Sequence, residues 1–459
     1  MQELRLRSLR RALKGNESLV VFISFLLLFA LVTHKVSWGW NDLSRFATIE
    51  SIVEEGTLQI DDSSFFNRTG DKYYYNGHYY SDKPPILQIA AAPVYYSLWS
   101  DGFSFVAEPK ISQFMVTFLT IGVLSSLGLV FFNKSLHVMG VEGGWRGLLT
   151  LIAGTGTLVF PYSGIFNNHV VSGALLMIAF YHLLRIGDGV RYAVVAGVMH
   201  SLAGSIDFTT FIFIPFALIV FHKRPLKLVV AFLIGTIPLT LTYFSITMLV
   251  SGSILPPGLN TALWDYPGSI FDESNLSGVA RHGSLAEVGV YTFHMLAGNR
   301  GLFSHTPILL VSIYALLRVL RQDTVFRGYY RYITLASAAF ILSYILMSNN
   351  YSGGAYGVRW FTSIMLIGMI PLAGIRDAFR DNRVLRLLFI FLAALSILVA
   401  LIGTAQPWAP VHDNMSSITE CIKVLAEKSP IFRIKTLVLT VVIYTLFFSY
   451  CMKIFNKEG

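Results

Sequence analysis

Residues 19–46 read LVVFISFLLLFALVTHKVSWGWNDLSRF, an apolar run that ends at Val32 and is followed by a polar segment. Residues 1–14 carry five Lys and Arg side chains. The run lacks a small-x-small cleavage site and many more apolar runs follow it, so we expect an uncleaved first membrane helix instead of a secretory signal. The basic residues before it predict an amino end in the cytoplasm.

The composition of the whole chain is that of a membrane protein. Of its 459 residues, 54% are hydrophobic and only 13% are charged, with a mean hydropathy of +0.60, whereas soluble domains are about 25% charged. A water-soluble enzyme is therefore excluded. Lys and Arg (35) outnumber Asp and Glu (26). In a membrane protein such an excess is first expected to reflect basic residues in the cytoplasmic loops. Two cysteines, Cys421 and Cys451, support neither a disulfide framework nor a thiolate metal site.

Further apolar runs predict an all-α, polytopic bundle of about 12 (11–13) membrane helices that forms one domain over residues 1–459. The stretch Pro84–Trp99 is too short to span comfortably and begins with two prolines, so we place it in the outer interface. The runs fall near residues 111–132, 146–162, 168–185, 190–205, 207–221, 226–251, 304–321, 332–348, 358–375, 384–405 and 434–453.

The basic clusters between these runs set the orientation. With 190–205 and 207–221 forming a hairpin around Asp207, the clusters fall in short cytoplasmic loops, as the positive-inside rule requires. Both chain ends are then cytoplasmic, in a plasma or inner membrane. Three larger polar segments are expected at the extracytoplasmic face, where we expect the active site, and they cover residues 38–110, 252–303 and 406–433.

The first of these polar segments gathers most of the candidate chemistry. Apolar residues recur at helical spacing from Ser44 to Glu54, which predicts an amphipathic helix lying on the bilayer and ended by Gly56. Asp42 would cap that helix or act chemically, and Lys83 would bind a ligand or anchor the loop at the headgroups. Charged groups at a membrane boundary favour function, and the segment holds Asp42, Arg45, Asp71, His78, Asp82 and Lys83.

Several motifs follow the first apolar run in a defined order. An acid directly after the first helix is followed by Ser-Arg-Phe (44–46) and then by Tyr-Ser-Asp-Lys-Pro-Pro (80–85). This order resembles the GT-C membrane glycosyltransferases, and within them the chain is similar to the family 39-like branch that contains the protein O-mannosyltransferases and the lipid A aminoarabinose transferases. The resemblance continues through GTGTLVFPYSGIFNNHV (154–170), GNRGLFSHTPILL (298–310) and NNYSGGAYGVRWF (349–361).

This resemblance implies a GT-C-type bundle that transfers a sugar from a polyprenyl-phosphate donor to a lipid, glycan or protein acceptor. Asp42 matches the family's first-loop acid, but it follows Asn41 instead of standing in an Asp-Glu pair. The catalytic base is therefore Asp42, Asp71 or Asp82. No cofactor is certain, and the resemblance allows a divalent metal held by Asp42 with His169.

Glycosyl-phosphate cleavage also needs cations for the departing phosphate. Lys83, Arg359 and Arg45 are the candidates, and Arg359 is equally well explained as an interfacial anchor. Asp207 is either a functional ionisable group or a helix cap. Candidates for the acceptor or carrier groove are His78, His169, Asn168 and Arg300, although helix capping explains the run Asn167-Asn168-His169 as well.

Two other classes of function fit part of the pattern. A transporter or flippase of a lipid-linked saccharide would also need cations and aromatics, but it should carry its polar groups at mid-membrane on broken helices. Here they cluster in the predicted outer segments. A noncatalytic scaffold that keeps the fold is the third alternative.

Overall fold

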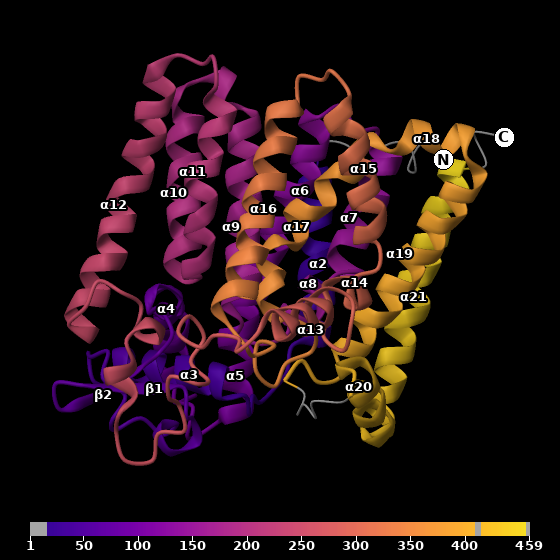
Figure 1. The fold of residues 1–459 in the computed structure, drawn as a ribbon. Helices are drawn as coiled ribbons and strands as arrows, with labels where there is room; N and C mark the ends of the chain where they lie inside the picture. The colour runs from indigo at the N-terminus through magenta and orange to yellow at the C-terminus, as the bar shows by residue number, and fades with distance from the viewer. Residues whose placement is uncertain (1–15, 409–414, 456–459) are drawn as a thin grey trace.

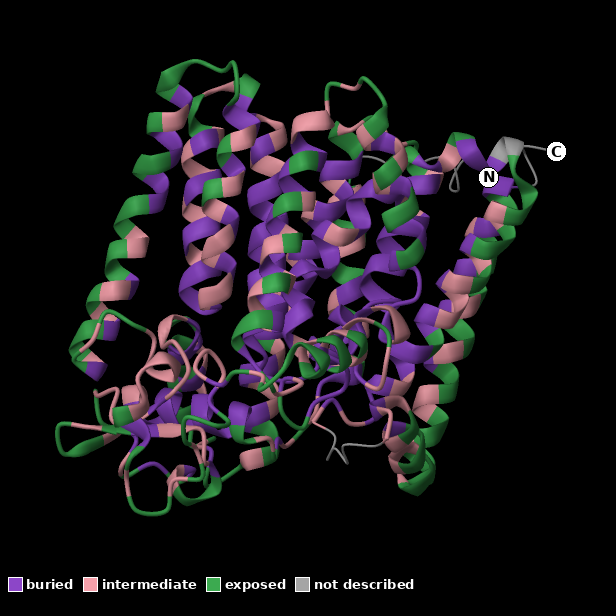
Figure 2. Ribbon diagram, in the orientation of Figure 1, coloured by how far each residue is buried: buried purple, intermediate pink, exposed green. Residues whose placement is uncertain are grey.

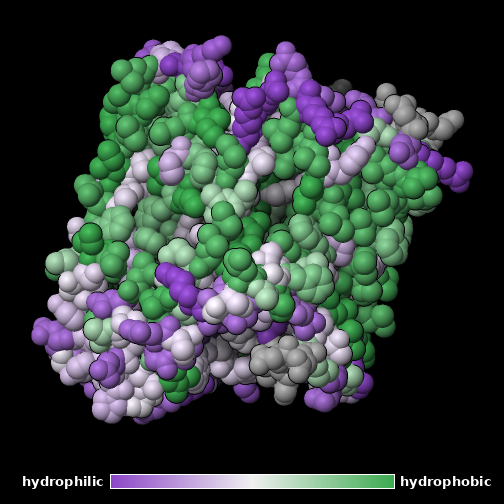
Figure 3. All heavy atoms as spheres, in the orientation of Figure 1, coloured by the Kyte–Doolittle hydropathy of each residue, from purple (hydrophilic) through white to green (hydrophobic). Residues whose placement is uncertain are grey.

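The computed structural model describes residues 16–408 and 415–455, and the basic cluster of residues 1–14 lies outside this range. Five of its helices are long and apolar enough to cross a membrane, and further helical stretches are apolar but shorter. Figure 3 shows a broad hydrophobic band between two hydrophilic ends. The chain is an integral membrane protein. The predicted number of about 12 spans stays a prediction.

The bundle consists of these long and short apolar segments (Figure 1). The long ones are Pro109–Val138, which joins α5 (Pro109–Thr117), η2 (Phe118–Gly122) and α6 (Val123–Val138), then α12 (Leu226–Ser251), α16 (Arg327–Met347), α19 (Arg383–Gly403) and α21 (Pro430–Phe455). The shorter ones are α2 (Glu17–Val32), α9 (Asn168–Leu184), α10 (Val190–Ile206), the η4–α11–η5 stretch (Phe208–Ile212, Phe213–Ala217, Leu218–Phe221) and the η8–α17–η9 stretch (Arg359–Ile364, Met365–Met369, Ile370–Gly374).

Several of the apolar runs are not single α-helices, and besides the α5–η2–α6 and η4–α11–η5 stretches two more are divided. The run 146–162 divides into α7 (Gly143–Thr155) and the short α8 (Val159–Tyr162), with Gly156 at the end of α7. The run 358–375 alternates between 3-10 and α-helix, and Pro371, which has no N–H to donate, lies in its last turn. Elsewhere α15 (Leu309–Arg321) and α18 (Arg376–Asp381) complete the helices of the upper part of Figure 1.

The exposed surface agrees with a lipid environment. In Figure 2, α12 and α21 stand at opposite edges of the bundle and carry exposed residues along their length. Many of these exposed side chains are large and apolar, including Leu241 and Leu249 of α12 and Leu437 and Val441 of α21. Such a row of apolar side chains is expected to face acyl chains.

The three polar segments gather at one end of the bundle (Figure 1). The start of α2 and the end of α21 both lie at the opposite end of the bundle. There Nη2 of Arg146 lies 2.5 Å from Oε2 of Glu17. The elements at the polar end are α3 (Trp40–Glu54), η1 (Phe66–Arg68), β1 (Lys72–Tyr75), β2 (His78–Ser81), α4 (Ile86–Ser100), η6 (Pro257–Leu259), η7 (Thr261–Trp264), α13 (Leu285–Leu296), α14 (Leu302–His305) and α20 (Ser417–Glu427), while η3 (Ile186–Asp188) lies at the other end.

The first-loop helix α3 is enclosed by protein. All its residues from Asn41 to Ser51 are buried, so the expectation that it lies on the bilayer surface is wrong. Its apolar face is covered by other parts of the chain, because the Phe46 ring packs within 5.8 Å of Phe65, Phe105 and Phe166, centroid to centroid. The capping alternative for Asp42 is also wrong, because the N-cap is Gly39.

A tyrosine-rich hairpin follows α3. Strands β1 and β2 pair antiparallel with Lys72 opposite Ser81, around a turn at Asn76 and Gly77 whose φ angles are 50° and 90°. Positive φ at both positions is the requirement of a type I′ turn, which Asn-Gly meets well. This pairing brings Asp71, just before β1, beside Asp82, just after β2.

Close packing of α10 against α12 fixes the other side of the polar end. Gly197 faces the carbonyl of Phe232, and Gly235 faces the carbonyl of Val194, with no room for a Cβ at either glycine. Small residues at such positions let two membrane helices approach closely. The α10–η4 turn at Asp207 therefore sits next to the last turns of α12 and the first turn of α9.

Candidate active site

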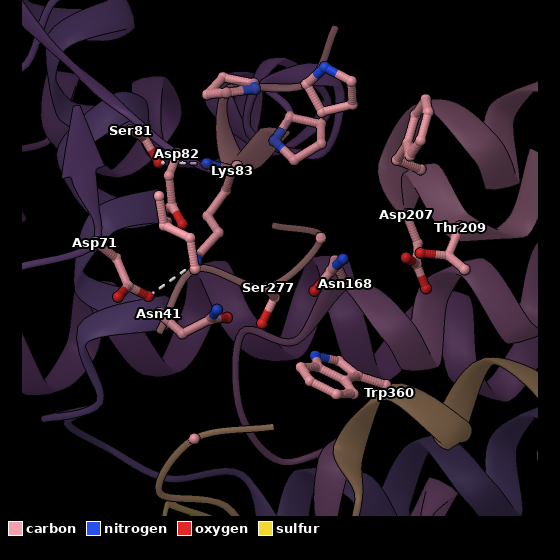
Figure 4. Close-up of a pocket in the computed structure, with 18 of the residues that line it drawn as sticks. Asn41, Asp71, Ser81, Asp82, Lys83, Asn168, Asp207, Thr209, Ser277 and Trp360 are labelled. Atoms are coloured by element: carbon pink, nitrogen blue, oxygen red, sulfur yellow. Dashed lines mark hydrogen bonds and ion pairs between the residues drawn. The ribbon is translucent and has the colours of Figure 1, made fainter. Parts of the chain in front are cut away.

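A cavity of about 870 Å³ opens among these elements at the polar end. Its walls come from the start of α3, the hairpin, the start of α9, the α10–η4 turn, the end of α12 and the loop before η8. Figure 4 shows Asp71, Asp82 and Lys83 on one side of this cavity and Asp207 and Thr209 on the other, with Asn168 between them. The cavity therefore joins segments that are far apart in the sequence.

Lys83 is held between two carboxylates. Its Nζ lies 2.9 Å from Oδ2 of Asp71 and 2.6 Å from Oδ2 of Asp82. Burial alone would raise the pKa of Asp71, but the Lys83 charge and hydrogen bond outweigh it and hold that pKa below its ordinary value. For Asp82, burial dominates and raises the pKa, with Lys83 opposing the shift and Asp71 adding to it. Of the two, Asp82 is the carboxylate that takes up a proton more readily.

Arg45 forms the floor of the cavity beside α9. Its side chain is 1% exposed and donates to the backbone and side-chain oxygens of Asn41, and also to Oδ1 of Asn168 at 2.7 Å. Burial lowers the pKa of Arg45 to about 10, against the opposing effect of the Asp42 charge. The guanidinium is therefore still charged at neutral pH.

Among Lys83, Arg45 and Arg359, the three candidate cations, Arg359 is the one for which no hydrogen bond from the side chain to another described residue is seen. It begins η8 at the cavity wall, and its Cζ lies 4.9 Å from the centroid of the Trp408 ring. Within residues 16–408 and 415–455, its Nε and Nη1 atoms are buried and have no hydrogen-bond acceptor. Buried donors without acceptors are uncommon and point to a missing partner.

Asp42 lies just behind this wall. The Asp42 side chain is fully buried, and its Oδ2 accepts from Ser37 Oγ at 2.5 Å and from Trp408 Nε1 at 2.8 Å. Its Oδ1 is occluded and has no partner among the described residues. Burial raises the pKa of Asp42, opposed by those two hydrogen bonds and by the charges of Arg45 and Arg359. Its neighbours Asn41, Arg45 and Trp408 line the cavity, whereas Asp42 does not.

Asp207 is the centre of a second polar group. Its Oδ2 accepts from His169 Nδ1 at 2.8 Å and from Ser363 Oγ at 2.7 Å, which ties α9, α10 and η8 together. Asn167 caps α9 through bonds from the N–H groups of His169 and Val170, so the capping interpretation holds for that residue. Asn168 and His169 instead line the cavity.

The rest of the cavity wall is largely aromatic and aliphatic. Trp360 stacks on Tyr344 with centroids 4.4 Å apart and an angle of 11° between the rings. Beyond Asp207 the wall continues along the ends of η4 and α12 with Phe208, Phe211, Ile212, Tyr243 and Val250. An apolar extension thus leads away from the charged part of the cavity.

Some predicted site residues do not reach the cavity. His78 is on the hairpin with 47% of its side chain exposed, 3.5 Å from Asp61, and it lies outside the cavity lining. Arg300 is buried behind the loop before η8, where it donates to the carbonyls of Gly353 and Ala355. Both were predicted in the groove; the hairpin turn carries His78 away, and Arg300 instead supports the loop that precedes Arg359.

The metal pair suggested by the sequence is not assembled in this arrangement. Asp42 and His169 each bind a different protein group. In the described part of the chain, no three His, Cys, Asp or Glu side chains are grouped so that they could hold an ion.

The sequence did not single out two groups that shape the site. Trp408 is 366 residues from Asp42 and lies at the end of a described segment, with nothing in its local sequence to distinguish it from an interfacial tryptophan. The Trp360–Tyr344 stack was likewise missed. For Asp207 the sequence did not decide between a functional role and helix capping. An ionisable residue inside an apolar stretch nevertheless favours a functional role.

The chain resembles known proteins in its fold, but not in its sequence. The chain matches none of the known sequence-family profiles and no curated protein. The crystal structure of ArnT from Cupriavidus metallidurans bound to undecaprenyl phosphate aligns with a TM-score of 0.51 and 12% identity, covering 96% of this chain and 77% of that one. The apo form of the same protein gives 0.52 and 12%, with 97% and 78% covered.

The archaeal oligosaccharyltransferase AglB from Archaeoglobus fulgidus, in complex with an inhibitory peptide and a dolichol-phosphate, gives a TM-score of 0.47 at 13% identity over 92% of this chain and 59% of that one. The alignments with ArnT span nearly the whole chain. The chain therefore has an ArnT-like fold, with a similar arrangement of its helices.

Proposed function

We propose that this protein is a membrane glycosyltransferase that takes a sugar from a polyprenyl-phosphate donor and transfers it to an acceptor, with its active site in the cavity at the polar end. We place that end at the extracytoplasmic face and both chain ends in the cytoplasm. The neighbour ArnT was crystallised with undecaprenyl phosphate, which is the carrier part of a donor of the proposed class.

The observation that carries the proposal is the Arg359 guanidinium, which has buried donors without acceptors at the wall of a cavity. A phosphate oxygen is the ligand that such a planar donor group binds best. Lys83 and Arg45 line the same cavity, so three cations would surround a phosphate bound there. Together they would stabilise the charge that gathers on the phosphate as the glycosyl bond breaks.

Carboxylates in and behind the cavity wall give Lys83 and Arg359 fixed positions. Asp71 and Asp82 hold the Lys83 ammonium by its two ion pairs, and Asp42 holds Trp408, whose ring supports Arg359. Preorganised charges of this kind need no rearrangement when the leaving group develops its charge. The apolar wall of Phe208, Phe211 and Tyr243 offers a path for the prenyl chain.

The test is transfer by purified protein in detergent. A panel of radiolabelled polyprenyl phospho-sugars is offered together with a membrane extract as the source of acceptor. We expect a labelled acceptor with the wild-type chain and a loss of about 10²–10³-fold with Arg359→Ala. Arg359→Lys should retain part of the activity, because it keeps the charge and loses the two-pronged geometry.

The matched control is Arg191→Ala, an exposed arginine at the opposite end of the bundle, which should leave transfer unchanged. Sealed vesicles distinguish the competing function. Movement of a lipid-linked saccharide across the vesicle membrane without any labelled acceptor would replace the transferase proposal by a transporter.

A further inference from the structure

The carboxylate of Asp207 is fixed in place from three sides. It follows the last residue of α10, is 4% exposed, and receives hydrogen bonds at Oδ2 from His169 of α9 and Ser363 of η8. Both bonds converge on the same oxygen. The orientation of the other oxygen, Oδ1, is therefore also fixed, although Oδ1 makes no hydrogen bond to a described residue.

That second oxygen, Oδ1, faces the cavity. No described residue donates a hydrogen bond to it, and it differs from the Oδ1 atoms of Asp42 and Asp82, which are occluded. Figure 4 shows Asp207 across the cavity from Asp71 and Lys83. A nine-tenths buried carboxylate with an unused oxygen at a cavity wall is expected to accept a proton or hydrogen bond from a ligand.

The four carboxylates near the cavity differ in what they can do. Asp71 and Asp82 share the Lys83 ammonium, and Asp42 lies behind the wall with its Oδ2 taken by Ser37 and Trp408. Asp207 is the one that combines a position in the lining with a free oxygen and has no Lys or Arg partner among the described residues.

We infer that Asp207 is the catalytic base of the proposed transfer and that the attacking group of the acceptor is an alcohol hydroxyl. This inference rests on the proposed function. The hydroxyl oxygen attacks the anomeric carbon, its proton passes to Oδ1 of Asp207, and the bond from that carbon to the phosphate oxygen breaks. The electron pair leaves with the polyprenyl phosphate, whose charge Arg359 and Lys83 compensate, and the proton later returns to solvent.

The surroundings of Asp207 specify this acceptor chemistry. A phosphate oxygen as nucleophile is already ionised, needs no base, and would be repelled by the Asp207 charge. The cavity residues that follow Asp207 in the chain are Phe208, Thr209 and Phe211, and among the described residues Asp207 has no Lys or Arg partner that would offset this repulsion. A neutral hydroxyl, in contrast, gains from a fixed carboxylate within hydrogen-bond reach.

Asp207→Asn tests the inference because it keeps the size of the side chain and an oxygen for the bonds from His169 and Ser363. We expect transfer to fall by about 10²–10⁴-fold, the usual contribution of a general base. Affinity for undecaprenyl phosphate should stay within about twofold of wild type, since only the step after donor binding is affected. Asp188→Asn, an exposed carboxylate paired with Arg185 at the other end of the bundle, is the matched control.

A second variant separates chemistry from folding. In Asp207→Ala the carboxylate is removed and leaves space, so added formate should restore part of the transfer if a base is what was lost. Loss without rescue, together with a changed affinity for undecaprenyl phosphate, would assign Asp207 a structural role and overturn the inference.

The choice of acceptor is tested with three compounds and the wild-type chain: a saccharide with free hydroxyls, a Ser/Thr-containing peptide and a phosphorylated glycolipid blocked at its hydroxyls. Label on the saccharide or the peptide supports the inference and identifies the source of the hydroxyl, whereas label on the phosphate overturns it. If the wild-type chain labels nothing from any polyprenyl phospho-sugar, the proposed function itself fails. Transfer by wild type that Asp207→Asn retains within about threefold refutes only the role of Asp207.

Discussion

The indole N–H of Trp408 donates to Oδ2 of Asp42 at 2.8 Å, while the same ring lies 4.9 Å from Cζ of Arg359. One side chain therefore connects a buried carboxylate with a guanidinium at the cavity wall. Because the Asp42 oxygen fixes the plane of the indole, it also fixes the surface on which Arg359 rests. Asp42 is in this arrangement a positioning residue for the cation proposed to bind phosphate.

Removing the Trp408 ring should weaken phosphate binding. A cation above an indole gains about 0.5–2 kcal/mol, so Trp408→Leu is expected to raise the Kd for undecaprenyl phosphate by about 2- to 30-fold. Trp408→Phe keeps an aromatic face and should cost less. Equilibrium binding of labelled undecaprenyl phosphate measures both. Equal effects of the two variants would show that the ring face does not support Arg359.

Asp42→Asn separates positioning from base catalysis. An amide oxygen can still accept from Trp408 and Ser37, so we expect transfer to fall by less than about tenfold, well below the loss typical of a general base. Asp42→Leu, which cannot accept either bond, should lose both transfer and carrier affinity. If Asp42→Asn instead abolishes transfer with unchanged carrier affinity, the base is Asp42, one of the three carboxylates that the family resemblance left as candidates.

Donor binding should depend on pH through Asp82. Burial raises its pKa above the ordinary 3.8, and an anionic phosphate beside Lys83 should raise it further. The bound state then holds more protons, so affinity is greatest at low pH. It falls, by at most about tenfold per pH unit, as the pH rises from the pKa of Asp82 in the free protein to its higher pKa in the bound state. The measurement is the Kd of a polyprenyl phospho-sugar, whose phosphodiester keeps one charge over this range.

Asp82→Asn removes the titrating group and should give a flatter curve of Kd against pH. Asp188→Asn should keep the wild-type slope, because that carboxylate is exposed at the far end of the bundle. A slope that Asp82→Asn leaves unchanged would mean that another group takes up the proton.

The sequence predicted which segments meet more reliably than how their side chains meet. The motif around Asp82-Lys83, the amides at Asn168 and the Arg359 loop were each chosen from local residue types, and all three line one cavity. That outcome follows from hydropathy, because runs of known length place their connecting segments at one end or the other.

The remaining features depend on contacts between distant segments. The periodicity of α3 predicts one apolar face, but the polar face is also covered, by the hairpin and α9, so Arg45 and Asn168 pair inside the protein. The partner of Asp42 comes from a residue 366 positions away, and the partners of Asp207 come from α9 and η8. No local pattern encodes such pairings.

The contact between α10 and α12 should control both stability and the cavity. A Cβ at Gly197 or Gly235 would collide with a backbone carbonyl of the facing helix, which cannot rotate away as a side chain does. Gly197→Ala and Gly235→Ala are therefore each expected to destabilise the protein by about 1–3 kcal/mol, the usual cost of overpacking. Thermal unfolding in detergent measures the effect.

The same substitutions should reach the active site, because α10 leads directly into Asp207 and α12 supplies Tyr243 to the cavity wall. We expect weaker binding of undecaprenyl phosphate at temperatures where the variants are still folded. Gly289→Ala in α13 is the control, since a Cβ there meets nothing within 4 Å and alanine favours the helix. Unfolding temperatures that are the same for Gly197→Ala and Gly289→Ala would show that α10 and α12 can separate at no cost, and the close approach would then have no part in shaping the site.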